Sequence, residues 1–585
     1  MGNPTKLIMS FMLASMLVFA IACGSSDDDT SSVANSAGVT ADAANLPVEL
    51  PTIVAPQEAT YLKALEPNAK NGGILNYAWV ASPPHFDMHQ SGTTNNCTPQ
   101  CPLFDLMVVN DPTDNQRAIV NGGVAQSWDT SADGLTWTFN LRKNVDFHDG
   151  SHMTSADVEA TFNRIIFPSD TVNSRRKDLF NAVTDVSAPD EYTVNFTTAN
   201  PVSGGYFLQA LASGFNVILS KANLELNNDD LKAIPDYPGT GAFKYVSHVD
   251  AEKWIAVKNE SYWNPNLPYL EGINTFHVSG STGAAQRVAG LMTGQFDYAR
   301  GIDPQTYNKW QANPEEGIST VRFPQTTIIA MWFNLAKQDS VLQDANVRKG
   351  ISYLFDRDAF VKGTESVRPF YPAFGFVPYF SQYAESTETA RNRPGYAATG
   401  TAERQAEVDK ANELFKAAGV KEGTQLTLLH ANSDWQKMMG DLSASMVRSS
   451  PYFEVTQEEV EYAMWIEKTE EGAFDLSMGP LVYAFADPSA FARPWYHSEG
   501  KTNFSKNVDT KIDDLIGKID VEMDVTKRKA ITRELDLYLE ETMPLAPLLW
   551  EEFVDAYRSD IKGYDFPGIQ GLYNAEIKST WWMDR

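Results

Sequence analysis

The order of hydrophobic and polar residues along the chain predicts both strands and helices. Residues 74–80 form a mainly apolar run that indicates a buried first strand. Residues 137–141 and 191–196 alternate between apolar and polar positions, which is typical of half-buried strands, and 328–334 predicts another apolar strand. Because the mixture shows no fixed repeat period, it favours an α/β or α+β fold over a solenoid.

Helical spacing appears between these strands. Ser155 is a good N-cap for an amphipathic helix whose apolar positions include Val158 and Phe162. A second helix is expected over 346–355, with Arg348 and Lys349 facing solvent, and a third over 525–538. Residues 543–550 then return to an extended buried run, and a short helical patch is expected at 57–65.

The first fifty residues have the pattern of an export signal followed by a tether. Lys6 precedes an apolar run over 7–22, which at 16 residues falls short of the roughly 20 that span a bilayer. Small residues before Cys23 describe a cleavable signal over 1–22. From Gly24 to about Leu50 the chain has few bulky apolar residues, so 23–68 is expected to be an N-terminal region that includes a flexible tether.

Composition excludes one class of partner. The 585 residues carry 47 Lys+Arg against 75 Asp+Glu, a formal net charge of -28, whereas nucleic-acid binding requires a basic footprint. Such acidity is typical of a soluble exported surface. With 43% hydrophobic residues, the chain can bury the cores of several domains.

Cys97 and Cys101 are the only cysteines besides Cys23. Because export places them in an oxidising compartment, a disulfide between them is expected. A metal site is the alternative, but no second cysteine pair completes a four-ligand set. We expect no metal and no cofactor.

Several segments resemble the extracellular solute-binding proteins of peptide, nickel and opine ABC importers. They follow the family order: Ala125-Gln-Ser-Trp128, Asp133-Gly134-Leu-Thr-Trp-Thr-Phe139, Leu141-Arg142-Lys143-Asn-Val-Asp-Phe147-His148-Asp149-Gly150, Ala156-Asp157-Val158, Gly239-Thr240-Gly241, Tyr262-Trp263-Asn264-Pro265, Val347-Arg348, Phe355-Asp356-Arg357 and Asp487-Pro488. Asp133-Gly134 and 147–150 read as turns, so we expect this signature, including Trp137, to be scaffold. Cys23 similarly resembles the cysteine that bacterial lipoproteins acylate, which implies anchoring to the membrane by lipid.

The resemblance implies a bilobal α/β fold of the periplasmic-binding-protein type, the large class with an extra subdomain. Lobe I would cover 69–325 and lobe II 326–545, with 546–585 returning to lobe I, and two crossing strands would join the lobes. It also implies a monomer that captures a peptide-like small solute outside the cytoplasm and delivers it to ABC permease subunits. Hinge closure around the ligand is the expected motion.

Candidate ligand contacts lie in three stretches where the family's cleft is expected. The residues are Phe86, Trp332, Asn334, Arg368, Tyr483 and Phe485. Core packing is an equally good explanation for each aromatic residue. Ala484 stands where peptide-binding relatives tend to carry an aspartate for the ligand's α-ammonium, so peptide is a default expectation only. His85 and His89 are four residues apart, but their loop contains Pro83-Pro84, and a metal site there is not expected.

The alternatives to an import receptor are an exported enzyme, such as a hydrolase, and a signalling receptor on the same scaffold. A non-peptide cargo, such as a metal chelate, an opine or a saccharide, is a further alternative. The sequence contains none of Gly-x-Ser-x-Gly, His-Glu-x-x-His or a phosphate-binding Gly-x-x-x-x-Gly-Lys-Ser/Thr. We therefore expect a binding protein and not an enzyme, although a catalytic triad can be spatial.

Overall fold

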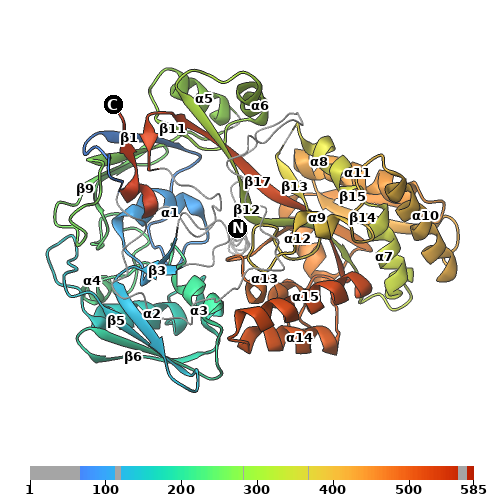
Figure 1. The fold of residues 1–585 in the computed structure, drawn as a ribbon, viewed down its shortest axis with the longest axis horizontal. Coiled ribbons are helices and arrows are strands. Elements are labelled where there is room, and N and C mark those ends of the chain that lie inside the picture. Colours follow the sequence, from blue (N-terminus) through green and yellow to red (C-terminus); the bar gives the residue numbers. More distant parts are fainter. Residues whose placement is uncertain (1–65, 112–119, 281, 367, 564–575) are drawn as a thin grey trace, which may run out of the picture.

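The computed structural model describes residues 66–111, 120–280, 282–366, 368–563 and 576–585. Within them the chain forms two α/β lobes that lie side by side and are joined by two long strands (Figure 1). The expected bilobal α/β fold is confirmed. The signal sequence, Cys23, the tether and the patch at 57–65 lie outside the described residues. No described helix has both the length and the apolarity needed to span a bilayer.

One sheet runs through both lobes, and among the described strands it has eleven members. In the main path the strand order is β15-β14-β16-β12-β17-β11-β1-β10-β9-β8, and β13 pairs with β17. The crossing strands are β12 (Ile318–Phe333) and β17 (Leu545–Arg558), which pair antiparallel. Their register shifts between Pro324 and Ile328, so the ladder is interrupted between the lobes.

Lobe I holds one end of this sheet and a separate four-stranded sheet of order β4-β5-β7-β6. Its strands are β1 (Ile74–Trp79), β2 (Val108–Asn110), β3 (Val120–Gly122), β4 (Ala125–Thr130), β5 (Thr136–Leu141), β6 (Val183–Asp190), β7 (Thr193–Thr198), β8 (Phe243–Val249), β9 (Lys253–Lys258), β10 (Gly272–His277), β11 (Tyr298–Ala299), β18 (Ile561–Lys562) and β19 (Trp582–Met583). Its helices are α1 (Thr94–Gln100), α2 (Ser155–Ile166), α3 (Gly204–Leu211), α4 (Lys221–Leu226), α5 (Gly283–Met292) and α6 (Pro304–Ala312), with 3₁₀ turns at Cys101–Leu103, Lys177–Phe180 and Glu576–Thr580.

Lobe II holds the other end of the sheet between two helical layers. Its strands are β13 (Phe370–Pro372), β14 (Thr424–Ala431), β15 (Phe453–Val460) and β16 (Leu476–Val482). Its helices are α7 (Ala345–Leu354), α8 (Arg357–Thr364), α9 (Thr387–Arg391), α10 (Ala402–Ala417), α11 (Asp434–Arg448), α12 (Tyr462–Glu471), α13 (Pro488–Tyr496), α14 (Thr510–Val521) and α15 (Val525–Thr542), with a 3₁₀ turn at Val341–Gln343. Two buried apolar clusters, one on each face of the sheet, form its core.

The family-like signature of lobe I is scaffold, as its turn residues indicate. Asp133-Gly134 closes the β4–β5 hairpin, and Gly134 has a φ of +72°, which glycine adopts without strain. Trp137 on β5 is completely buried in the core of the four-stranded sheet. The N-cap of α2 is Thr154 and not Ser155, because the Thr154 side chain and Asp157 form a capping box one residue earlier.

The orientation expected for Arg348 is wrong. Its side chain is buried and donates hydrogen bonds to the carbonyls of Leu342, Gln343, Thr542 and Met543. These carbonyls lie at the ends of the 341–343 turn and of α15, where helix termini leave acceptors unsatisfied. Burial lowers the pKa of Arg348 to about 10. This arginine therefore joins α7 to α15.

Candidate functional site

The carboxyl ends of the parallel strands in each lobe lead to the junction between the lobes. In lobe II, β14 is parallel to β15 and β16, and in lobe I, β1 is parallel to β10 and β11. The crossing strand β12 reaches β16 first through Thr327, the partner of Val482 at the carboxyl end of β16. In open α/β sheets, the crevice outside the carboxyl ends is where ligands bind. The candidate site is therefore the junction of these two strand ends.

Tyr483 lies at this junction, directly after β16. Its backbone N–H donates to the Thr326 carbonyl at 3.1 Å, and its ring lies 6.1 Å from that of Trp550 on the return strand. The side chain is only 3% exposed, and its hydroxyl has no hydrogen-bond partner in the described part of the chain. Burial raises the pKa of Tyr483 well above its usual value. A buried hydroxyl of this kind is a group that a bound solute or water can satisfy.

Arg368 lies beside Glu551 on the same return strand. The two side chains form an ion pair at 2.6 Å, and the guanidinium lies 5.4 Å from the Trp435 ring centre at the start of α11. Both charged groups are largely buried. Burial, and secondarily the negative charge of Glu551, raises the pKa of Tyr462 to about 12. Arg368 and Tyr483 thus contact consecutive residues of β17, Glu551 and Trp550, whose side chains point to opposite faces of the strand.

Charged residues on the crossing strands extend this group. Glu552 accepts hydrogen bonds from Arg322 Nε at 2.6 Å and from the Tyr379 hydroxyl at 2.7 Å. Asp555 accepts from the Gly301 backbone N–H at 2.7 Å and pairs with Arg300 at 3.0 Å. These residues were not among the contacts predicted from the sequence. The signal was present, because Glu551-Glu552 interrupts the apolar run that begins at Met543.

Phe86 and Phe485 lie in different surroundings. The half-buried Phe86 ring packs within lobe I, 5.3 Å from His248 and 5.9 Å from Trp254. Phe485 comes from lobe II but packs into the core cluster of the four-stranded sheet in lobe I, with its ring 5.1 Å from that of Tyr206. Phe485 therefore bridges the lobes.

Trp332 and Asn334 do not lie with the other candidates. Both follow the lobe II part of β12 away from the junction, where Trp332 pairs with Ser477 and Leu545. Trp332 is 1% exposed between Trp465 and Phe504, and Asn334 donates to the carbonyls of Gly472 and Phe474. These positions correct the expectation that the two residues line the junction. Because β12 enters lobe II at Thr327, the later residues Trp332 and Asn334 lie at the end of lobe II that is farthest from the junction.

The cysteine pair and His89, which the sequence also singled out, are internal to lobe I. Cys97 and Cys101 form a disulfide, with Cα atoms 4.8 Å apart. His89 is fully buried with Nε2 2.9 Å from the Val217 carbonyl, and burial lowers its pKa to about 3. Among the described residues, no group of three or more His, Cys, Asp or Glu is placed to hold a metal ion.

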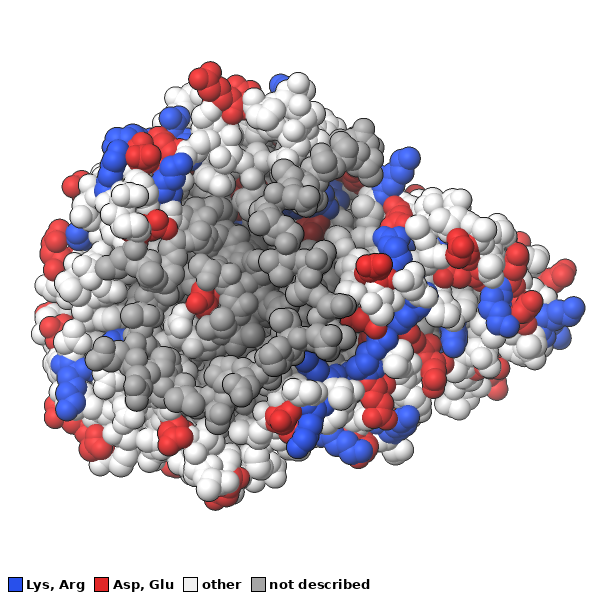
Figure 2. Space-filling model, in the orientation of Figure 1, with Lys and Arg blue, Asp and Glu red and all other residues white. Residues whose placement is uncertain are grey.

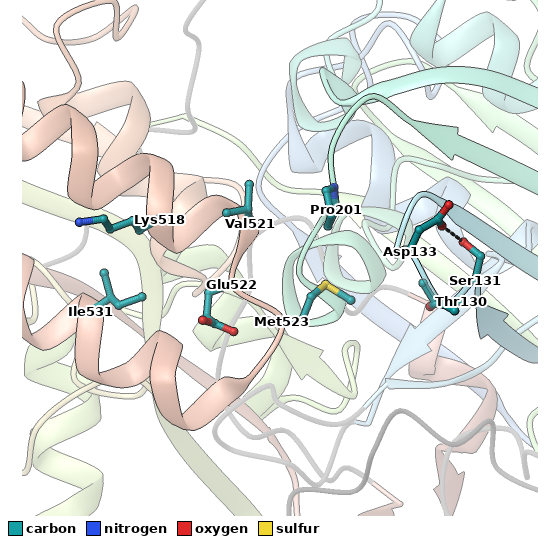
Figure 3. A pocket seen from close by; sticks show the side chains of 11 residues that line it. Thr130, Ser131, Asp133, Pro201, Lys518, Val521, Glu522, Met523 and Ile531 are labelled. Carbon is teal, nitrogen blue, oxygen red and sulfur yellow. Dashed lines mark hydrogen bonds between the residues drawn. The ribbon is translucent and has the colours of Figure 1, made fainter.

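A groove of about 620 Å³ lies at the outer edge of the junction (Figure 3). One wall is the β4–β5 hairpin of lobe I with Pro201, and the other is the α14–α15 turn of lobe II. Asp133, Val521 and Met523 line it, and Figure 3 shows Met523 directed toward the hairpin. On the visible face, acidic and basic side chains are interspersed over lobe II (Figure 2).

Comparisons with known proteins identify similar sequences and a similar fold. The family model described as "Bacterial extracellular solute-binding proteins, family 5 Middle" matches residues 120–503. The chain is 24% identical over 512 residues to the probable D,D-dipeptide-binding periplasmic protein DdpA of Escherichia coli K12, covering 86% of this chain and 93% of DdpA. It is 26% identical over 463 residues to the glutathione-binding protein GsiB of the same strain, covering 75% and 82%.

Among solved structures, the fold is similar to that of the periplasmic binding protein DppA of Helicobacter pylori in complex with the peptide STSA. The TM-score is 0.68 at 21% identity, covering 88% of this chain and 99% of DppA. At this identity the likeness concerns the fold.

Proposed function

Because this chain belongs to the bacterial extracellular solute-binding proteins of family 5, we propose that it is the receptor of an ABC importer that captures small peptides. The observation that supports this most directly is the junction of strand carboxyl ends at two crossing strands, since such a junction places a ligand between two bodies that can close on it. The similarity to DdpA, a probable D,D-dipeptide-binding protein, and to the glutathione-binding protein GsiB supports a peptide-like cargo.

We further propose that the protein works as a monomer, held to the outer face of a membrane by lipid on Cys23, and delivers its solute to permease subunits. The small residues before Cys23 support acylation, and the polar stretch after it supports a tether. We assign the protein binding and no catalytic step. The register shift after Pro324 supports a first lobe boundary near 325/326. On β17 the same shift falls near Glu551, so we place the return to lobe I there, several residues beyond the expected 545/546.

Within the junction we propose that Tyr483 and Arg368 contact the ligand. The unpaired Tyr483 hydroxyl supports this role, and the Arg368–Glu551 pair can exchange partners with a zwitterion's carboxylate and ammonium groups. Phe86 remains a candidate on the lobe I side. Trp332 and Asn334 are not included, because their contacts lie inside lobe II.

Isothermal titration calorimetry tests this proposal. We expect one-to-one binding of at least one of D-Ala-D-Ala, glutathione and an L-dipeptide, and weaker binding of that peptide by Tyr483→Phe and Arg368→Gln. Trp332→Phe is the matched control and should leave the affinity unchanged. Failure of all three peptides to bind the folded protein would contradict a peptide cargo, and unchanged affinity in both junction variants would contradict the assigned contacts.

A further inference from the structure

We propose that a contact between α3 of lobe I and the segment after β16 of lobe II is a closure seam, which sets ligand retention without touching the ligand. The closure seam consists of Gly205 and Tyr206 from lobe I and of Tyr383, Phe485 and Asp487 from lobe II. This proposal rests on the proposed function, because retention has meaning only for a solute receptor.

In the apolar part of the closure seam, side chains of the two lobes are buried against each other. The Tyr206 and Phe485 rings meet edge to face at 5.1 Å, and Phe485 is 1% exposed. Ala490 from α13 is also buried in the lobe I cluster, and Phe380 packs against it. Since Phe485 packs into the core of the other lobe, separating the lobes returns apolar surface to water. Figure 1 shows α3 and α13 adjacent at the junction.

The polar part of the closure seam is rigid. Arg528 is fully buried and donates to the Tyr383 hydroxyl at 2.7 Å, to Asp487 Oδ1 at 2.7 Å and to Ser489 Oγ at 2.8 Å. Asp487 also caps α13 by accepting from the Ser489 backbone N–H at 3.0 Å. Burial, and secondarily the charge of Asp487, raises the pKa of Tyr206. The side chains of Tyr383 and Asp487 are therefore held in position by Arg528.

Gly205 allows the lobes to approach this rigid surface. A Cβ atom at position 205 would lie 3.3 Å from the Tyr383 hydroxyl and 3.8 Å from Asp487 Oδ2. The backbone of Gly205 does not have a positive φ, so the glycine is not needed for a turn. Because Arg528 fixes the neighbouring atoms, a larger side chain at 205 has to displace one lobe from the other.

An ion pair at the margin of the contact provides positions at which closure of the lobes can be measured. Asp178 of lobe I pairs with Lys501 of lobe II, and the two side chains are 57% and 75% exposed. Exposed pairs of this kind contribute little to stability, so the pair can be replaced without loss of closure. Cysteines at 178 and 501 can be joined by a short thiol crosslinker only when the lobes are together.

The experiment measures the crosslinked fraction of the full-length protein carrying Asp178→Cys and Lys501→Cys. Adding Gly205→Leu should lower this fraction about tenfold, and the affinity for a bound dipeptide should fall by the same factor. The matched control is Gly517→Leu, because a Cβ at position 517 on α14 meets nothing within 4 Å. Equal crosslinking in the Gly205 and Gly517 variants would overturn the proposal.

A second variant covers the case in which Gly205→Leu does not fold. Tyr206→Ala removes one ring of the contact without adding volume, and it should also lower the crosslinked fraction; an unchanged fraction would overturn the closure seam. Crosslinking needs no ligand. A protein that shows the crosslinking difference but binds no peptide would therefore contradict the peptide cargo, and the closure seam would stand only as the contact that holds the lobes together.

Discussion

Trp137 provides a direct test of the distinction between scaffold and site. Its side chain is completely buried on β5, with its ring 5.2 Å from that of Phe207. A buried tryptophan removes roughly 150–250 Å² from water, which at about 25 cal/mol per Å² corresponds to about 4–6 kcal/mol. Measured Trp→Ala substitutions in cores cost about 3–5 kcal/mol. We expect Trp137→Ala to lower the free energy of unfolding by about 4 kcal/mol.

Urea denaturation followed by circular dichroism measures this loss. The matched control is Leu226→Ala, since Leu226 in the same lobe is 78% exposed and its loss should change stability by less than about 0.5 kcal/mol. Ligand affinity, measured at low temperature on the folded fraction of Trp137→Ala, should remain close to that of the wild type. Normal stability together with lost binding would refute the assignment of Trp137 to the scaffold.

Three further predictions concern a buried acid, a buried arginine and the anchor. Burial raises the pKa of Asp105 to about 6 from 3.8. The folded state therefore holds the proton more tightly than the unfolded state, and the free energy of unfolding falls as pH rises from about 4 to about 6. Asp105→Asn should abolish about 3 kcal/mol of this fall in denaturation curves measured across that range. Identical pH profiles of the wild type and Asp105→Asn would contradict the prediction. Arg348→Met should destabilise by about 3 kcal/mol in chemical denaturation, because several helix-end carbonyls lose their donor, whereas Lys349→Met should change little; equal effects would contradict the buried orientation. Cys23→Ser should release the protein from the membrane fraction and abolish labelling by an alkyne fatty acid, and retention with label would place the lipid elsewhere.

The strands and helices that local patterns predicted in the body formed close to their expected positions. The alternation at 137–141 and the apolar run at 74–80 became β5 and β1 within one residue at each end. Such patterns are reliable because each face of a strand lies against a single environment, either the protein core or solvent. The Asp133-Gly134 turn was equally readable, since its chemistry is contained within the turn.

The errors arose where distant segments decide the outcome. Arg348 occupies a helix position that reads as exposed, but the end of α15, nearly two hundred residues away, supplies the carbonyls that bury it. Trp332 looked like a ligand contact because it lies on a crossing strand, yet the direction of β12 places it at the far end of lobe II. Sequence spacing shows neither the direction of a crossing strand nor the partner of a buried cation.

The closure seam shows a further limit of the sequence. Gly205 and Phe485 each have an unremarkable local pattern, and their relation depends on how the two lobes are placed. The acidic pair Glu551-Glu552 was more accessible to prediction, because charges within an apolar strand require buried partners. Those partners, Arg368 and Arg322, come from other parts of the fold.

Native mass spectrometry of the purified full-length protein tests the central claim most directly. If the protein captures a small peptide between its lobes, a fraction of molecules should carry one additional mass that is released intact on unfolding, and that fraction should fall in Tyr483→Phe. A folded protein that carries no ligand and takes up none of the test peptides, or that releases a cleaved product of an added peptide, would contradict the account.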